Sequence, residues 1–259
     1  MNNDKAKTRN VMFSSAAGYQ LAASIDYLVG IEPVQCVIMT HCFTCNKQTL
    51  TTARLSRGLA QAGFVVLRLD FTGLGESGGD FSTSHFSSMV SDIESAGAFL
   101  SDNYQPASAL IGHSMGGTAC LAASQNGCSA LSEVSRLVTL ASPAHPDHVL
   151  HHFGSALLKL ERGENAEIRV AGKDFPVVPG FIENIRSYNM DKQMRSCHLP
   201  ILAVRAGRDA LVGAEDADQI MSLTSGPATL FQIDEADHLF SHREHADILL
   251  DRVSGWFAS

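Results

Sequence analysis

Residues 109–123 read ALIGHSMGGTACLAA and contain the strongest structural signal in the chain. The apolar start is typical of a buried strand, and the small residues after Gly116 are typical of a closely packed helix. Between them lies the pattern G-x-S-x-G, with Ser114 at its centre. Glycines two positions either side of the serine let a strand and a helix approach closely around a sharp turn. The stretch therefore predicts a strand, a tight turn and a helix.

The predicted turn would hold Ser114 over the end of a sheet in strained backbone geometry. A serine in that place suits nucleophilic attack, and the Met115 N–H at the start of the helix is placed to stabilise an oxyanion. His113 shares the turn, so we expect it to pack beside the serine rather than to act as its base. The alternative is a glycine-rich turn that only joins a strand to a helix.

Strand patterns alternate with helix patterns along most of the 259-residue chain. After a hairpin of 11–14 and 21–28, apolar runs predict strands at 34–39, 64–69, 109–111, 137–140, 201–206 and 229–233. Periodic apolar residues predict helices at 52–62, 86–100, 117–123 and 246–256. This alternation predicts an α/β fold with a mostly parallel central sheet and helices on both faces.

The interval 142–199 interrupts this rhythm, because no strand of the main sheet is predicted there. We interpret it as a lid inserted between two parts of the core, residues 1–141 and residues 200–259. Its apolar residues would line a substrate site, and the candidates for that role are Phe153, Leu157 and Phe181.

Two later loops supply a candidate acid and a candidate base for Ser114. Asp209 follows the strand 201–206, and His238 follows the last predicted strand, just before the final helix. Sites of open parallel sheets form at the carboxyl ends of the strands, and the order Ser, Asp, His suits such a site. A histidine can accept the serine proton near neutral pH, while an aspartate sets its tautomer. Asp234 and Asp237 lie near enough to compete for the role of the acid.

With these residues in place, the chain resembles the α/β-hydrolase superfamily. More narrowly, the motif HCFTC at 41–45 and the loop DFTGLGES at 70–77 resemble those of serine hydrolases found fused to or beside OsmC-like domains. The resemblance implies hydrolysis of an ester, thioester or amide carbonyl through an acyl-Ser114 intermediate. It also implies that the Phe43 N–H is the second oxyanion donor. Cys42 stands where the superfamily usually has glycine, which restricts the backbone of this loop.

Cys42 and Cys45 also support a function of another class, a thiol redox protein, because a C-x-x-C pair can have a depressed thiol pKa. A third class, a non-catalytic binding protein on a hydrolase scaffold, predicts a broken Ser-Asp-His set, and none of the three positions is broken. We expect no cofactor and no metal. The cysteine pair lacks two further ligands at the usual spacing, and the histidines of 145–152 are interpreted as a solvated or lid-lining face.

Composition favours an enzyme of the cytoplasm. The chain is 45% hydrophobic, has a net charge of −8 and begins with the polar run MNNDKAK, without an export signal. The negative charge disfavours nucleic acid and anionic membrane surfaces as partners. The six cysteines are expected to be mostly reduced. A small-molecule acyl compound is the expected substrate, and a second copy of the chain or an OsmC-like protein are the partners left open.

Overall fold

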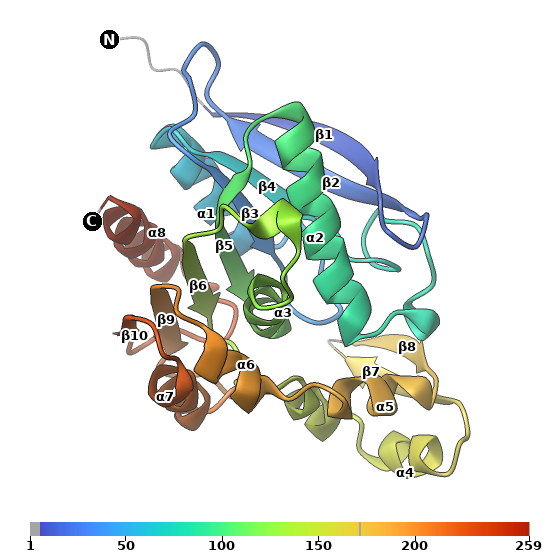
Figure 1. The fold of residues 1–259 in the computed structure, drawn as a ribbon. Coiled ribbons are helices and arrows are strands. Elements are labelled where there is room, and N and C mark those ends of the chain that lie inside the picture. Colours follow the sequence, from blue (N-terminus) through green and yellow to red (C-terminus); the bar gives the residue numbers. More distant parts are fainter. Residues whose placement is uncertain (1–5, 171, 259) are drawn as a thin grey trace.

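The computed structural model describes residues 6–170 and 172–258, and these build one large sheet covered by helices (Figure 1). Within them the sheet has the strand order β1-β2-β4-β3-β5-β6-β9-β10. Its strands are β1 Lys7–Ser14, β2 Gln20–Tyr27, β3 Cys36–Thr40, β4 Val65–Leu69, β5 Ala107–His113, β6 Arg136–Leu140, β9 Ile201–Ala206 and β10 Ala228–Ile233. β1 and β2 form an antiparallel hairpin beside β4, and every pairing from β4 to β10 is parallel. The predicted α/β fold is confirmed.

Helices cover both faces of the sheet, and each face has its own apolar cluster. The long helices are α1 Leu50–Gln61, α2 Phe86–Asn103, α3 Met115–Ser124, α7 Ala214–Leu223 and α8 Arg243–Phe257. Side chains of α1 and α8 form one buried cluster with the sheet, and side chains of α2 and α3 form the other. Each cluster removes a continuous apolar surface from water, which is the main driving force for folding.

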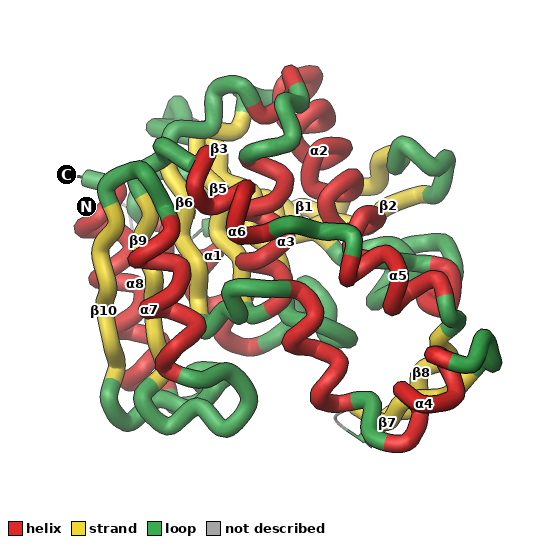
Figure 2. Tube along the Cα trace, turned by 60° about the horizontal axis from the view of Figure 1, so that its bottom comes forward, coloured by secondary structure: helices red, strands yellow, loops and turns green. Residues whose placement is uncertain are grey.

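Residues 142–199 add no strand to the central sheet in the part of the interval that the structure describes. They form the 3₁₀ helix η3 Pro146–His152, α4 Ser155–Glu161, a hairpin of β7 Ala166–Val170 and β8 Lys173–Val177, α5 Gly180–Arg186 and α6 Met190–Ser196. Figure 2 shows α4 and the hairpin projecting away from the sheet, whereas α6 lies against α3 and α7. A lid role for this interval stays a prediction.

The turn between β5 and α3 is built around Ser114, which has φ 54° and ψ −129°. The neighbouring glycines leave no room for a side chain. A Cβ on Gly112 would lie 2.3 Å from the Gly117 Cα, and one on Gly116 would lie 2.4 Å from the carbonyl oxygen of His41. The strand and the helix therefore meet backbone to backbone, and Ser114 takes the strained positive-φ conformation that the sharp turn requires.

Within the described residues, no helix combines the length and the hydrophobicity that crossing a membrane requires.

The close contact between β5 and α3 can be tested by adding a single methyl group. A Cβ on Gly117 would lie 2.0 Å from the Ser142 Oγ and 2.8 Å from the Gly112 carbonyl oxygen. We expect Gly117→Ala to lower the free energy of unfolding by about 1–3 kcal/mol or more, because the backbone has to move. Gly255→Ala is the matched control, since its Cβ would meet no atom within 4 Å in the helix α8. It should stabilise by up to about 1 kcal/mol. Urea unfolding measures both, and equal effects would contradict the interpretation.

Candidate active site

The structure brings Ser114 and His238 into the wall of one cavity of about 400 Å³. Ser114 follows β5, His238 follows β10, and Asp209 follows β9. Because these strands belong to the parallel part of the sheet, their carboxyl ends and the loops after them meet at the same edge. Residues far apart in sequence are thereby brought to one edge of the sheet.

Asp209 sets the orientation of the His238 ring. Its Oδ2 accepts a hydrogen bond of 2.8 Å from the His238 Nδ1, and its Oδ1 accepts from the N–H groups of Leu211 and Val212 at 2.8 and 3.0 Å. Burial alone would raise the pKa of Asp209, but these hydrogen bonds outweigh burial and hold the pKa below its usual range. With Nδ1 as the donor, Nε2 is the ring nitrogen left to accept a proton.

The two rival carboxylates are occupied elsewhere. Asp237 accepts from the N–H and the hydroxyl of Ser241 at 2.7 and 2.6 Å, and Asp234 accepts from the Gln232 side chain at 2.6 Å. The His113 ring lies beside that of His238, and its Nε2 donates to the His238 carbonyl oxygen at 2.7 Å. Complete burial lowers the pKa of His113 to about 3, so the ring stays neutral and supports the loop.

Two backbone amides face the same cavity without an acceptor. Phe43 and Met115 both line it, and neither N–H donates a hydrogen bond to any group in the described part of the chain. The close approach of Gly116 to the His41 carbonyl oxygen packs the loop of Phe43 directly on the start of α3. Two adjacent, unpaired N–H groups are the arrangement that binds a negatively charged oxygen.

Cys42 and Cys45, the pair whose state the sequence left open, form a disulfide on either side of Phe43. The Cys45 N–H also donates to the Cys42 carbonyl oxygen at 3.1 Å. Thr44 has a positive φ of 61°, whereas the φ of Cys42 is not positive. Position 42 therefore does not need the conformational freedom of glycine, because its φ is not positive. The remaining cysteines are free: Cys36, Cys120, Cys128 and Cys197.

A buried ion pair fixes the end of the same loop. The backbone N–H of Lys47 donates to Asp70 Oδ1 at 2.6 Å, and its Nζ donates to Asp70 Oδ2 at 2.5 Å. The Glu76 N–H adds a third bond to Asp70 at 2.9 Å, and Arg68 donates to the Lys47 carbonyl oxygen at 2.5 Å. Sequence reasoning missed the role of Lys47. The signal was a lysine two residues after the cysteine motif, with the acidic loop 70–77 as its partner.

None of the three lid residues expected to line the substrate site lines the cavity of Ser114. Neither Phe153 nor Leu157 lines the cavity of Ser114, because η3 turns His148, Val149 and His152 toward it instead. The Phe153 ring stacks on Phe181 with 5.5 Å between centroids, and Leu157 packs against the apolar cluster. Phe181 lines a second pocket.

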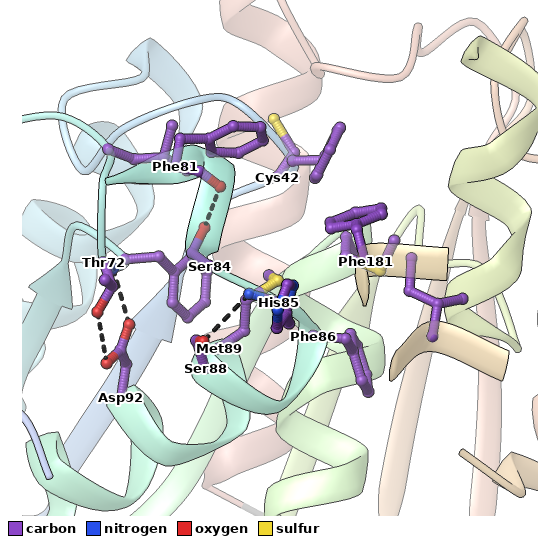
Figure 3. Close-up of a pocket in the computed structure, with 15 residues that line it drawn as sticks. Cys42, Thr72, Phe81, Ser84, His85, Phe86, Ser88, Met89, Asp92 and Phe181 are labelled. Atoms are coloured by element: carbon purple, nitrogen blue, oxygen red, sulfur yellow. Dashed lines mark hydrogen bonds between the residues drawn. The ribbon is translucent and has the colours of Figure 1, made fainter. Parts of the chain in front are cut away.

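This second pocket is a narrow slot of about 20 Å³ beside the first cavity (Figure 3). The two share Cys42, Phe43 and Met115 in their walls. Asp92, on α2, accepts from the N–H and the hydroxyl of Thr72 at 2.8 and 3.0 Å. Its side chain is buried, and burial raises its pKa from the usual 3.8 to about 6.

No group of three or more histidine, cysteine or carboxylate side chains within residues 6–170 and 172–258 is arranged to hold a metal ion. The histidines of the lid interval have other contacts. His145 binds Asp191 at 2.7 Å, and His148 lies 3.8 Å from Asp216.

Comparison with known proteins places this geometry in context. Residues 32–254 match the model of the Hydrolase_4 family, described as serine aminopeptidase, S33. The chain is similar to the esterase domain of a Rhodothermus marinus protein, with 29% identity, a TM-score of 0.77, and coverage of 96% of this chain and 97% of that chain. No curated protein matches it in sequence.

Two further solved structures share the fold at lower identity. Est1E from Butyrivibrio proteoclasticus with ferulic acid bound has 16% identity and a TM-score of 0.77, over 96% of this chain and 98% of that chain. Mouse alpha/beta hydrolase domain-containing protein 10 has 15% identity and a TM-score of 0.76, over the same shares of each chain.

The raised pKa of Asp92 predicts a pH-dependent stability. A carboxyl whose pKa rises on folding stabilises the folded state below its unfolded pKa, and that contribution is lost as the pH rises through about 6. A shift of about two units corresponds to about 3 kcal/mol. Between pH 4 and 8 the free energy of unfolding of the parent should fall by about this amount relative to that of Asp92→Asn, measured by urea unfolding. Asp102→Asn, an exposed position on the same helix, is the control. A constant difference between Asp92→Asn and the parent would contradict the prediction.

Proposed function

Because this chain belongs to the Hydrolase_4 family, described as serine aminopeptidase, S33, and is an α/β-hydrolase enzyme, we propose that it cleaves a carboxylic ester through an acyl-Ser114 intermediate. A thioester or an amide is the chemically related alternative. The observation that carries the proposal is the bond between Asp209 and His238 in the loops beside Ser114, at the edge of a cavity large enough for a small molecule.

Each group has a defined role in the proposed reaction. The His238 Nε2 accepts the proton of the Ser114 hydroxyl as its oxygen attacks the carbonyl carbon, and Asp209 stabilises the imidazolium that forms. The oxyanion of the tetrahedral intermediate accepts hydrogen bonds from the Phe43 and Met115 N–H groups. The same imidazolium then protonates the leaving group, and a water activated by His238 hydrolyses the acyl-enzyme.

An ester is the first choice of substrate, for two reasons. The cavity beside Ser114 is lined by apolar side chains such as Val149, Leu211 and Leu239, with few charged groups. The solved structure at 29% identity is an esterase domain. The net charge of −8 favours a small-molecule substrate over nucleic acid. A cytoplasmic location, a lid role for residues 142–199 and a homodimer or an OsmC-like partner belong to the same proposal.

A thiol redox function is the second candidate, because Cys42 and Cys45 are joined in a disulfide and Cys45 lines the open cavity. Under this alternative a dithiol substrate would reduce the Cys42–Cys45 disulfide to two thiols and would itself be oxidised to a disulfide. The position of the pair around Phe43 favours a structural role in the loop instead.

The triad roles can be tested by substitution. Ser114→Ala or His238→Ala should lower kcat on p-nitrophenyl acetate by about 10⁴- to 10⁶-fold, and Asp209→Asn by somewhat less. Asp237→Asn is the matched control, since that carboxylate binds Ser241, and it should change kcat only a few-fold. Retention of the esterase rate in Ser114→Ala would overturn the mechanism. A benign Asp209→Asn with an inactive Asp237→Asn would overturn only the choice of acid.

The cysteine pair separates the two candidate functions. Cys45→Ser should keep kcat on the same ester within about tenfold, because Lys47 and Asp70 still hold the loop. A loss of about 10²- to 10³-fold, the cost of one oxyanion donor, would show that the disulfide positions the Phe43 N–H. Under the redox alternative, dithiol-dependent turnover of a hydroperoxide or a disulfide should vanish in Cys45→Ser and persist in Ser114→Ala. No such turnover in the parent would exclude that alternative.

A further inference from the structure

The narrow slot beside the cavity of Ser114 takes no part in the proposed chemical steps. It lies between the start of α2 and the helix α5, and Figure 3 shows the side chains that close it. Its walls are mainly aromatic and apolar: Phe71, Leu74, Phe81, Phe86, Met89, Phe181 and Ile185. The rings pack against one another, with the Phe43 centroid 5.6 Å from that of Phe81 and 5.9 Å from that of Phe181.

The position of the slot relative to His238 distinguishes the two ends of a substrate. His238 and Leu239 line the large cavity and not the slot. Because His238 has to protonate the leaving group, the leaving group belongs on its side, in the large cavity. Phe43 and Met115 stand between the two spaces, so a carbonyl oxygen bound to their N–H groups leaves the acyl substituent facing the slot.

The size of the slot limits what it can take. A volume of about 20 Å³ holds little more than one water-sized group, the size of a methyl. The large cavity of about 400 Å³ has room for a ring-sized molecule. Close packing makes the difference effective, because aromatic walls that already contact one another do not open without losing those contacts.

The slot also discriminates by charge. Asp92 and Thr72 form part of its wall, and no cationic side chain of the described residues pairs with the buried Asp92 carboxyl. An anionic acyl group would bring a second negative charge next to this carboxylate in a site of low dielectric. A neutral alkyl group has no such cost.

Resting on the proposed function, we propose that the enzyme is selective for short, uncharged acyl groups, acetyl and propionyl, on bulky alcohols or phenols. The acyl group occupies the slot beyond Phe43, and the alcohol occupies the large cavity. Selectivity for the acyl group therefore comes mainly from α2 and its neighbours in the first part of the chain.

Two ester series test this division. One keeps p-nitrophenol and lengthens the acyl group from acetyl through propionyl and butyryl to hexanoyl, with monosuccinyl as the charged acyl. The other keeps acetyl and enlarges the phenol from phenol to naphthol. We expect kcat/KM to fall at least tenfold from propionyl to hexanoyl, and further for succinyl, but to change less than tenfold across the phenols. Equal rates for acetyl and hexanoyl esters would overturn the inference.

Matched methionine variants locate the selectivity. Met89 lines the slot and is half-buried, so Met89→Ala enlarges it and should raise the ratio of the hexanoyl to the acetyl kcat/KM at least tenfold. Met12→Ala, at a 53% exposed position on β1, should leave the ratio unchanged. Met89→Val is the milder variant if Met89→Ala does not fold. An unchanged ratio in a folded Met89 variant would overturn the assignment of the slot.

Ser114→Ala separates failure of this inference from failure of the proposed function. Ester hydrolysis that depends on Ser114 but does not fall with acyl length would overturn only the role of the slot. Hydrolysis that survives in Ser114→Ala, or no hydrolysis of any ester by the parent, would overturn the proposed function and the inference with it.

Discussion

The backbone contact between β5 and α3 is the constraint on which the candidate site depends. Gly112 and Gly117 approach so closely that a Cβ on Gly112 would lie 2.3 Å from the Gly117 Cα. The chain therefore reverses direction around one residue, Ser114, at φ 54°. Because the turn is so sharp, the Ser114 side chain points out of the sheet, and the Met115 N–H begins the helix without an acceptor. The proposed nucleophile and one of the two proposed oxyanion donors thus come from one local geometry.

The opposite wall of the cavity is held by buried charges. The proposed role of the Phe43 N–H as an oxyanion donor requires it to stay unpaired, so neighbouring residues have to anchor its loop. Lys47 and Asp70 are each 1% exposed, and each makes several hydrogen bonds besides the ion pair. Those bonds offset the cost of removing both charges from water. The disulfide of Cys42 and Cys45 links the two ends of the short segment that contains Phe43. Through Asp70, the loop 70–77 thereby supports the loop of Phe43.

The lid interval shows where sequence periodicity stops being informative. Its apolar residues Phe153, Leu157 and Phe181 were expected to line the substrate site, but none of them lines the cavity of Ser114. Phe153 stacks on Phe181, Leu157 packs on the core, and Phe181 lines the neighbouring slot. In short helices of one or two turns, an apolar residue can face the core or a cavity with the same spacing. Which face turns inward is decided by neighbours far along the chain. Phe43, for example, packs against Phe181, and Phe81 packs against Phe175.

The sequence by itself determined the alternation of strands and helices, the turn at Ser114, and the order of Ser114, Asp209 and His238. These features follow from local rules, since side-chain periodicity and the steric needs of a tight turn act within a few residues. Only the tertiary structure decided that Asp209 rather than Asp237 binds His238, that Lys47 pairs with Asp70, and that a narrow slot lies beyond Phe43. Each of these depends on distances between segments that are far apart in the chain. Such distances are set by how whole elements pack, which no local pattern encodes.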